Sequence, residues 1–324
     1  MEEQEQQPTE EQAKPEGPLY HYTDQKGLLG IIHDKCIWAT HVQYLNDTSE
    51  GKIVSQAVFN ELCSAYNTDS LFQSLGITPN INTNKYECVH EEVIGKALSM
   101  ATWATTQNSF VTSFSMQGNL LSQWRAYSGK SVGYSIGFEP SYLIAAEEHF
   151  KRSQSSSTCI NLGTLARCVY YDEKEKQLLQ GEIESLASSY FKEADLIAGA
   201  PVDKGIQGFK SLDAIALKHF ISLGKSNAIT KDYGFYEEEE WRFVFLLNQN
   251  SIPTDLKFRV GSSMLIPYLE IPLRWEDQRI EIKEIIIGPC PHPDDAIKSV
   301  EMLLKREGIP SVEVKGSKIP YRNG

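Results

Sequence analysis

The chain has 324 residues and a formal net charge of −12. This length is sufficient for one large domain or two ordinary ones. Its 41% hydrophobic and 23% charged residues are typical of a soluble globular protein. The excess of negative charge argues against non-specific binding to nucleic acid or anionic membranes, although a local basic patch remains compatible with a nucleic-acid substrate.

Membrane, secretion and metal signals are missing from the sequence. No apolar run approaches the roughly 20 residues needed to span a bilayer. The Glu- and Gln-rich start has neither the basic region nor the apolar stretch of a signal peptide. The six cysteines form no CxxC pair and lack histidines at zinc-ligand spacing. We therefore expect a cytoplasmic protein with no membrane partner and no metal site.

The predicted elements begin after a tail. Residues 1–18 have almost no apolar side chains, so we expect a disordered acidic tail. A short strand is predicted at Leu19–Tyr22, and Thr23 or Asp24 then caps an amphipathic helix. Further along, strands are predicted at 36–40, 110–115, 131–138 and 165–171, and helices at 47–62, 85–106 and 120–127.

The second half contains two predicted helices at 173–198 and 211–223, which form a helical insertion around residues 172–225. Strands follow at 239–247, 256–260, 265–271 and 280–287, then a helix at 294–306 and a strand at 311–315. No linker or internal repeat divides the chain. The pattern predicts a single α+β domain over residues 19–324.

His21 is the first candidate site residue. It lies in Leu19–Thr23, where a strand passes into a helix and backbone groups, an imidazole and a hydroxyl come together. A histidine on a strand is often only a structural, hydrogen-bonded residue. As a site residue, a neutral imidazole can donate to a ribose hydroxyl through one nitrogen while a partner fixes the other.

The acidic run Glu237–Glu240 precedes an aromatic strand. If residues 238–245 are extended, Glu238, Glu240 and Arg242 share one face, and aromatic side chains occupy the other. The charged face either forms a solvated strand edge or lines a cleft. In a cleft, two carboxylates can stabilise positive charge on a sugar and accept a proton from a nucleophile.

The middle of the chain supplies hydroxyls, aromatic rings and a cation. Ser113 and Ser115 lie two residues apart in one predicted strand and therefore share a face of it. Arg125 and Tyr127 belong to the next predicted helix. Arg125 is suited to pairing with a pyrophosphate, and Tyr127 to stacking on a nicotinamide ring. The alternative is that Tyr127 is a core residue and Arg125 forms a structural ion pair. Neither a glycine-rich phosphate loop nor the GxSxG or HExxH motif occurs.

Ordered motifs from residue 19 to the end resemble one family. They are Leu19–Thr23, Tyr44–Asp47 with Glu50, Ser113–Ser115, Leu121–Tyr127, Gly133–Phe138, Phe235 with Glu238–Arg242, Pro267–Tyr268, Ile285–Pro289 and Pro320–Arg322. Together they are similar to the bacterial domain-of-unknown-function family 2971. The family implies no activity.

A second resemblance does imply one. The His-Tyr-Thr strand, the Ser-rich second segment and a late glutamate are similar to ADP-ribosyltransferase-like proteins. This resemblance implies a split antiparallel sheet, with NAD as the substrate. His21, Tyr22 and Thr23 would hold the nicotinamide-side ribose and the carboxamide. The remaining NAD contacts would come from Ser113, Ser115, Arg125 and Tyr127. Catalysis would fall to Glu240 and Glu238. The long helical stretch departs from the compact form of that fold.

The resulting hypothesis is a cytoplasmic NAD-dependent enzyme that transfers ADP-ribose to a macromolecular acceptor, protein or nucleic acid, as a bacterial toxin or phage-defence effector. The competing hypothesis is a non-enzymatic module that senses a nucleotide or binds a partner in a defence system.

Overall fold

The fold comes from a computed structural model that describes residues 15–45, 53–54, 57, 109–128, 132–153, 159–160, 165–171, 224–247, 255–276, 278–309 and 311–320. The helices are α1 (Gln25–Asp34), η1 (Val42–Tyr44), α5 (Leu121–Tyr127), α6 (Pro140–Ser153), η3 (Tyr233–Glu238) and α9 (Pro293–Arg306). The strands are β1 (Leu19–Thr23), β2 (Cys36–His41), β3 (Ser109–Ser115), β4 (Tyr134–Phe138), β5 (Cys159–Ile160), β6 (Ala166–Arg167), β7 (Val169–Tyr171), β8 (Thr230–Asp232), β9 (Glu240–Leu247), β10 (Lys257–Val260), β11 (Leu265–Pro272), β12 (Glu284–Ile287) and β13 (Glu313–Gly316).

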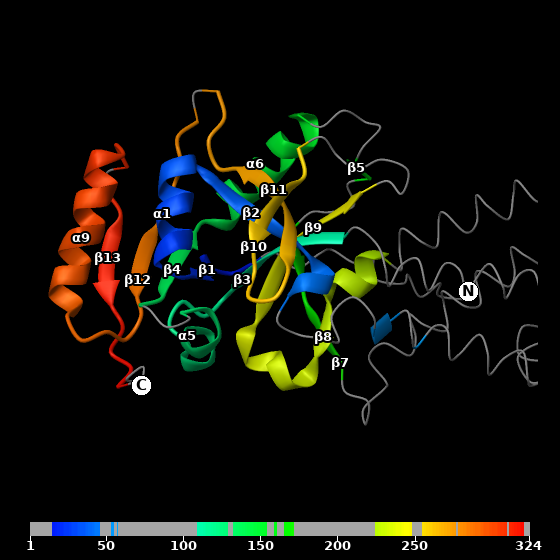
Figure 1. Cartoon of the computed structure of the whole chain (residues 1–324), viewed down its shortest axis with the longest axis horizontal. Coiled ribbons are helices and arrows are strands. Elements are labelled where there is room, and N and C mark those ends of the chain that lie inside the picture. Colours follow the sequence, from blue (N-terminus) through cyan, green and yellow to red (C-terminus); the bar gives the residue numbers. More distant parts are fainter. Residues whose placement is uncertain are drawn as a thin grey trace, which may run out of the picture.

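Eleven of the described strands form one large, mostly antiparallel sheet, with the order β10-β11-β2-β3-β1-β4-β12-β13 and with β9 on β3 (Figure 1). The pairing of β12 with β13 is parallel. The expected mixed fold with a largely antiparallel sheet is therefore confirmed. The predicted tail up to residue 14 and almost all of the predicted insertion lie outside the described residues.

The sheet forks at β3. Strand β9 pairs with β3 along its whole length, from Ser109 opposite Leu246 to Ser115 opposite Glu240. The other edge of β3 is shared: β2 pairs at Phe110 and Val111, and β1 pairs at Ser115. Between these two pairings, β1 and β2 diverge. The fork leaves backbone groups of β3 that need partners other than a neighbouring strand.

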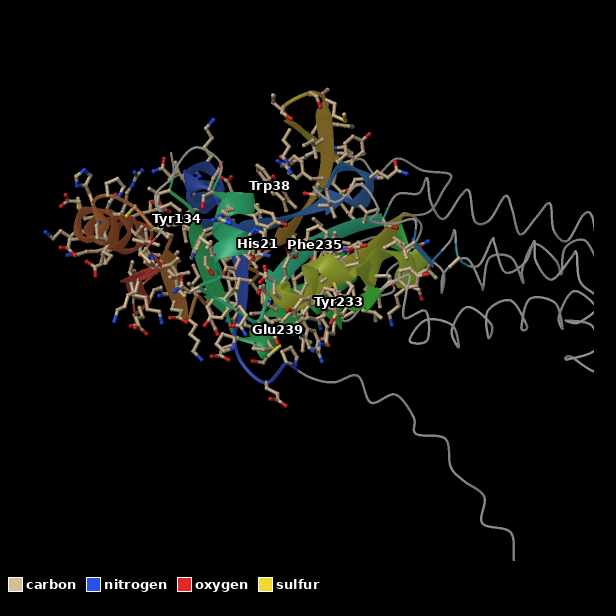
Figure 2. The ribbon with its side chains drawn as sticks, turned by 90° about the horizontal axis from the view of Figure 1, so that it is seen from below. His21, Trp38, Tyr134, Tyr233, Phe235 and Glu239 are labelled. Atoms are coloured by element: carbon tan, nitrogen blue, oxygen red, sulfur yellow. The ribbon has the colours of Figure 1, made fainter. Side chains whose placement is uncertain are left out.

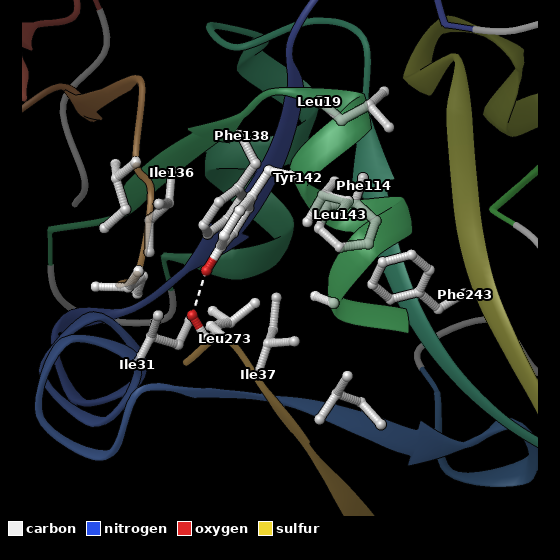
Figure 3. Packing of buried hydrophobic residues seen from close by; sticks show 14 of the residues in the cluster. Leu19, Ile31, Ile37, Phe114, Ile136, Phe138, Tyr142, Leu143, Phe243 and Leu273 are labelled. Atoms are coloured by element: carbon white, nitrogen blue, oxygen red, sulfur yellow. Dashed lines mark hydrogen bonds between the residues drawn. The ribbon is translucent and has the colours of Figure 1, made fainter. Parts of the chain in front are cut away.

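One apolar core covers one face of the sheet. Helices α1, α6 and α9 contribute Ile32, Leu143 and Leu304, which pack with Phe114 and Phe243 from the strands. Figure 3 shows this packing around Tyr142, whose hydroxyl donates to the carbonyl of Leu273. On the opposite face, α5 packs Trp124 against Tyr22 and Ile286. The site described below lies on this second face and at the fork.

The helix after β1 begins as the sequence predicts. Asp24 is the N-cap of α1, and its Oδ1 accepts a hydrogen bond of 2.8 Å from the backbone N–H of Gly27. This satisfies a donor that the first turn would otherwise leave unpaired. The cap fixes the point at which β1 ends, and therefore where His21 stands relative to β3.

In the part of the chain that the structure describes, no helix combines the length and apolar character required to cross a bilayer.

Candidate functional site

A small cavity opens on the fork between β1 and β3. Its volume is about 40 Å³. The residues that line it come from β1, β3, α5, η3 and β9: Tyr20, His21, Tyr22, Ser113, Phe114, Ser115, Gln123, Tyr127, Glu238 and Glu240. Seven of the nine residues predicted from the sequence therefore meet at one place. The other two, Thr23 and Arg125, are not among the residues that line it.

His21 fills the gap that the fork creates. Its Nδ1 lies 3.0 Å from the carbonyl oxygen of Ser113, and its ring packs edge-on against Phe114 with the centroids 5.9 Å apart. Because a carbonyl oxygen only accepts hydrogen bonds, Nδ1 must carry the hydrogen. Burial lowers the pKa of His21, although the bond to Ser113 opposes this shift. The ring is therefore neutral, and Nε2 is an acceptor.

This tautomer reverses the expected direction of one hydrogen bond. The sequence suggested that the imidazole would donate to a ribose hydroxyl. With Nδ1 donating to Ser113, the remaining nitrogen can only accept from such a hydroxyl. A hydroxyl serves equally well as donor, so His21 retains the ability to orient a sugar.

Glu238 and Glu240 reach the cavity from different elements. The predicted extended run starts only at Glu240, because Glu239 adopts the left-handed conformation with φ 43° and ends η3. Glu238 is the last residue of η3, so the expectation that it shares a strand face with Glu240 is wrong. The Ser115 hydroxyl donates to the Glu238 carbonyl at 2.6 Å and fixes this turn against β3.

The two carboxylates are held by two buried cations. Lys231 Nζ lies 2.6 Å from Glu238 Oε2 and 2.7 Å from Glu240 Oε2. Arg242 Nε donates to Glu240 Oε1 at 2.6 Å, and its Nη1 donates to the carbonyl of Ala228 at 2.8 Å. All four side chains are buried. Two buried carboxyl groups therefore contact two buried cationic side chains, and each carboxyl group has at least one cation as a partner.

The network separates the properties of the two acids. For Glu240, burial opposes ionisation, but Arg242 and Lys231 outweigh it and lower the pKa to about 2. For Glu238, burial is the largest effect and raises the pKa, while Lys231 acts in the opposite direction. Glu240 is thus ionised at every physiological pH. Of the two acids, Glu238 is the one that takes up a proton more readily.

The sequence does not identify Lys231 as a site residue, and it does not identify Arg242 as the ion-pair partner of Glu240. Lys231 lies on β8, a short strand that pairs with β7 outside the large sheet, and its partners follow seven and nine residues later. The acidic run itself is the signal that could have indicated such a partner, because carboxylates that become buried need buried cations. Arg242 shares a face with Glu240, as expected, but contacts Glu240 rather than the cavity.

Tyr20 forms a fixed wall of the cavity. Its hydroxyl donates to Glu284 Oε1 at 2.5 Å, and two glycines allow its ring to lie close to the backbone. A Cβ at Gly118 would lie 2.5 Å from the ring, and a Cβ at Gly137 would lie 2.9 Å from it. Tyr22 is fixed in a similar way, because its hydroxyl donates to the Gln117 carbonyl at 2.5 Å.

The η3 helix, which ends at Glu238 of the cavity, carries aromatic side chains. The η3 helix exposes Tyr233 and Tyr236, whose rings stack with centroids 5.1 Å apart. Lys231 Nζ lies 4.6 Å from the ring centre of Phe235. In the view from below, Figure 2 labels His21 and Phe235 near the middle, and Tyr233 of η3 and Glu239, the residue after η3, lower in the picture. No group of three or more potential metal ligands occurs among the described residues.

Residues 123–243 match a known family model. Its description is "Protein of unknown function (DUF2971)". The family resemblance identified from the sequence is therefore confirmed over this segment, which includes Gln123, Tyr127, Glu238 and Glu240 of the site. No curated protein and no solved structure matches the chain.

Proposed function

We propose that this DUF2971 protein binds NAD at the fork cavity and transfers ADP-ribose to a macromolecular acceptor, in the cytoplasm, as a toxin or phage-defence effector with an ADP-ribosyltransferase-like fold. The main support is the convergence of His21, Ser113, Ser115, Tyr127, Glu238 and Glu240 around one cavity from five separate elements. A histidine, an aromatic ring and two carboxylates are the groups that this chemistry requires.

Each group has a distinct role in the proposed reaction. The neutral His21 accepts a hydrogen bond from a hydroxyl of the nicotinamide-side ribose. The bond between ribose C1′ and nicotinamide breaks, and nicotinamide leaves with the bonding electrons. Glu240, ionised and rigidly held, stabilises the positive charge that develops on the ribose. Glu238 takes the proton of the acceptor group that bonds to C1′.

The size of the cavity adds a requirement. Pockets that bind drug-sized ligands usually span about 300–1,000 Å³, whereas this cavity has about 40 Å³. A nicotinamide ring therefore enters only if one wall moves. Tyr20 is fixed by Glu284 and two glycines, so the movement must come from another wall of the cavity.

A second candidate function has its own support. Both oxygens of Glu240 are engaged by cations, which weakens the field that this carboxylate exerts on a ligand. A site of this kind is compatible with a non-enzymatic module that binds a nucleotide or a partner protein without turnover. Binding and turnover must therefore be measured separately.

Substitution of His21 by Asn tests NAD binding. Asn retains an N–H group near the position of Nδ1 but has no atom in place of Nε2. We expect His21→Asn to weaken NAD binding about tenfold, which corresponds to the loss of one hydrogen bond of about 1.4 kcal/mol. Isothermal titration calorimetry of both proteins measures the change.

The matched control is His33→Asn, because His33 is an exposed residue of α1 that does not line the cavity. This variant should bind NAD like the wild type. Equal affinity of His21→Asn and wild type, or no binding of NAD by the wild type, would contradict the proposed NAD site.

A further inference from the structure

A second, larger pocket lies where two helices end. Its volume is about 510 Å³, within the range of small-molecule sites. It is lined by residues at the C-terminal ends of α1 and α9 and by the loop that joins β11 to β12, and it shares no residue with the fork cavity. Figure 1 shows both helix ends and this loop at the top of the molecule, whereas α5 lies in its lower part.

The β11–β12 loop carries two arginines in a fixed arrangement. Trp275 and Gln278 form an antiparallel bridge with hydrogen bonds in both directions. Arg274 and Arg279 flank this bridge on its two sides, and both line the pocket. Residues that flank such a bridge face one another across the turn, and their side chains share one face. The loop therefore presents two arginines to one pocket.

The loop is held in place by aromatic packing. The Trp275 ring stacks on Tyr142 with the centroids 5.7 Å apart, and on His149 with the centroids 5.4 Å apart. Both partners belong to α6, which packs into the main core. The packing of Trp275 on α6 therefore anchors the loop that carries Arg274 and Arg279 to the main core.

The two arginines have no acidic partner among the described residues. The two acids that line the pocket contact other groups: Glu307 pairs at 3.2 Å with Lys35, which also lines the pocket, and Glu281 accepts a hydrogen bond from Gln278. Like charges that face one another destabilise a turn unless an anion lies between them. Two unpaired guanidinium groups are notable in a chain with a net charge of −12.

The floor of the pocket is apolar. Ile280, Ile282 and Ile309 line it and are buried. A ligand that satisfies the whole pocket carries a doubly charged anionic group at one end and an apolar body at the other. Arginine pairs form bidentate hydrogen bonds to phosphate oxygens, and the isoleucines remove apolar surface from water.

We propose that this pocket binds a small phosphate monoester, with Arg274 and Arg279 on the phosphate and the isoleucine floor against an apolar or ring-shaped body. The pocket is separate from the fork cavity, so the proposal does not depend on NAD chemistry. Failure of one proposal leaves the other unaffected.

Phenyl phosphate is a suitable probe, because it combines a phosphate dianion with an apolar ring. Calorimetry with the full chain should give one binding site with a Kd on the order of 1 mM or tighter. Inorganic phosphate should bind at least about tenfold more weakly, since it lacks the ring, and phenol should not bind measurably.

The double substitution Arg274→Gln with Arg279→Gln should weaken phenyl phosphate binding at least about tenfold. Both residues are exposed, and their like charges are removed together, so the melting temperature should not fall while the binding is lost. Arg152→Gln, an exposed arginine at the end of α6, is the matched control and should bind like the wild type. His21→Asn should also leave this binding unchanged.

Three results would overturn the proposal. One is the absence of phenyl phosphate binding to the wild type. Another is equal affinity for phenyl phosphate and inorganic phosphate, which indicates only a general attraction of anions. The third is binding that the double arginine variant retains.

Discussion

Substitution of Glu240 by Gln is expected to lower the free energy of unfolding by about 3–5 kcal/mol, because it leaves two buried cations without sufficient negative charge. Glu240 is 3% exposed, and its two oxygens contact Lys231 and Arg242. Lys231 would keep Glu238, whereas Arg242 would lose the carboxylate that its Nε contacts at 2.6 Å. Urea unfolding of both proteins at neutral pH measures the difference.

Glu238→Gln is the matched comparison for this stability change. Glu238 contacts Lys231 through Oε2, and Lys231 retains Glu240 when Glu238 is replaced. We expect a loss of free energy clearly below that of Glu240→Gln. Equal stability of the two variants would show that the Arg242 contact does not organise the network.

The same network predicts an acid transition. The pKa of Glu240 is lowered from 4.5 to about 2 in the folded protein. A carboxyl group of this kind contributes stability that is present above about pH 4.5 and is lost as the pH falls towards 2. Glu240→Gln should therefore be less sensitive to acid over this range than the wild type, although less stable at pH 7.

Substitution of Glu238 should change the rate of catalysis with less loss of stability than substitution of Glu240. Glu238→Gln removes the group with the raised pKa while leaving the remaining ion pairs intact. Loss of a general base usually costs on the order of 10²–10⁴-fold in rate. We expect nicotinamide release from NAD to fall at least about a hundredfold, with NAD affinity nearly unchanged.

Glu239→Gln provides a control for this measurement. Glu239 lies next to Glu238 and contacts Gln117 outside the cavity, so its substitution should leave turnover near the wild-type rate. Wild-type turnover in Glu238→Gln would exclude Glu238 as the base. Loss of turnover in both variants would point to a general effect of charge near η3.

The sequence was sufficient to predict elements whose signals are local. The strand at β1, the cap at Asp24 and the helix α5 follow from hydrophobic alternation, a capping side chain and helical spacing. The grouping of His21 with Ser113, Ser115 and the glutamates came from the resemblance to ADP-ribosyltransferase-like proteins, and these residues line one cavity. The helix α6 was missed, although Pro140 at its start and Tyr142, Leu143, Ala146 and Phe150 at helical spacing indicate it.

Other features depend on contacts between distant segments and have no local signal. The left-handed Glu239 moves Glu238 from the strand to η3, and four consecutive glutamates do not reveal which one bends. The tautomer of His21 follows from the fork in the sheet, which only the pairing of β3 with three strands defines. Lys231 becomes a partner only when its Nζ on β8 meets Glu238 at the end of η3 and Glu240 at the start of β9.

Transfer of label from NAD to a macromolecule is the most direct test of the central claim. Purified protein is incubated with NAD labelled in the adenosine half and with a bacterial lysate, and protein and nucleic acid are then separated. We expect label in one macromolecular fraction with the wild type, and at least about a hundredfold less with Glu238→Gln. If wild-type protein binds NAD but moves no label to either fraction, the transferase account is contradicted, and the fork cavity is a nucleotide sensor.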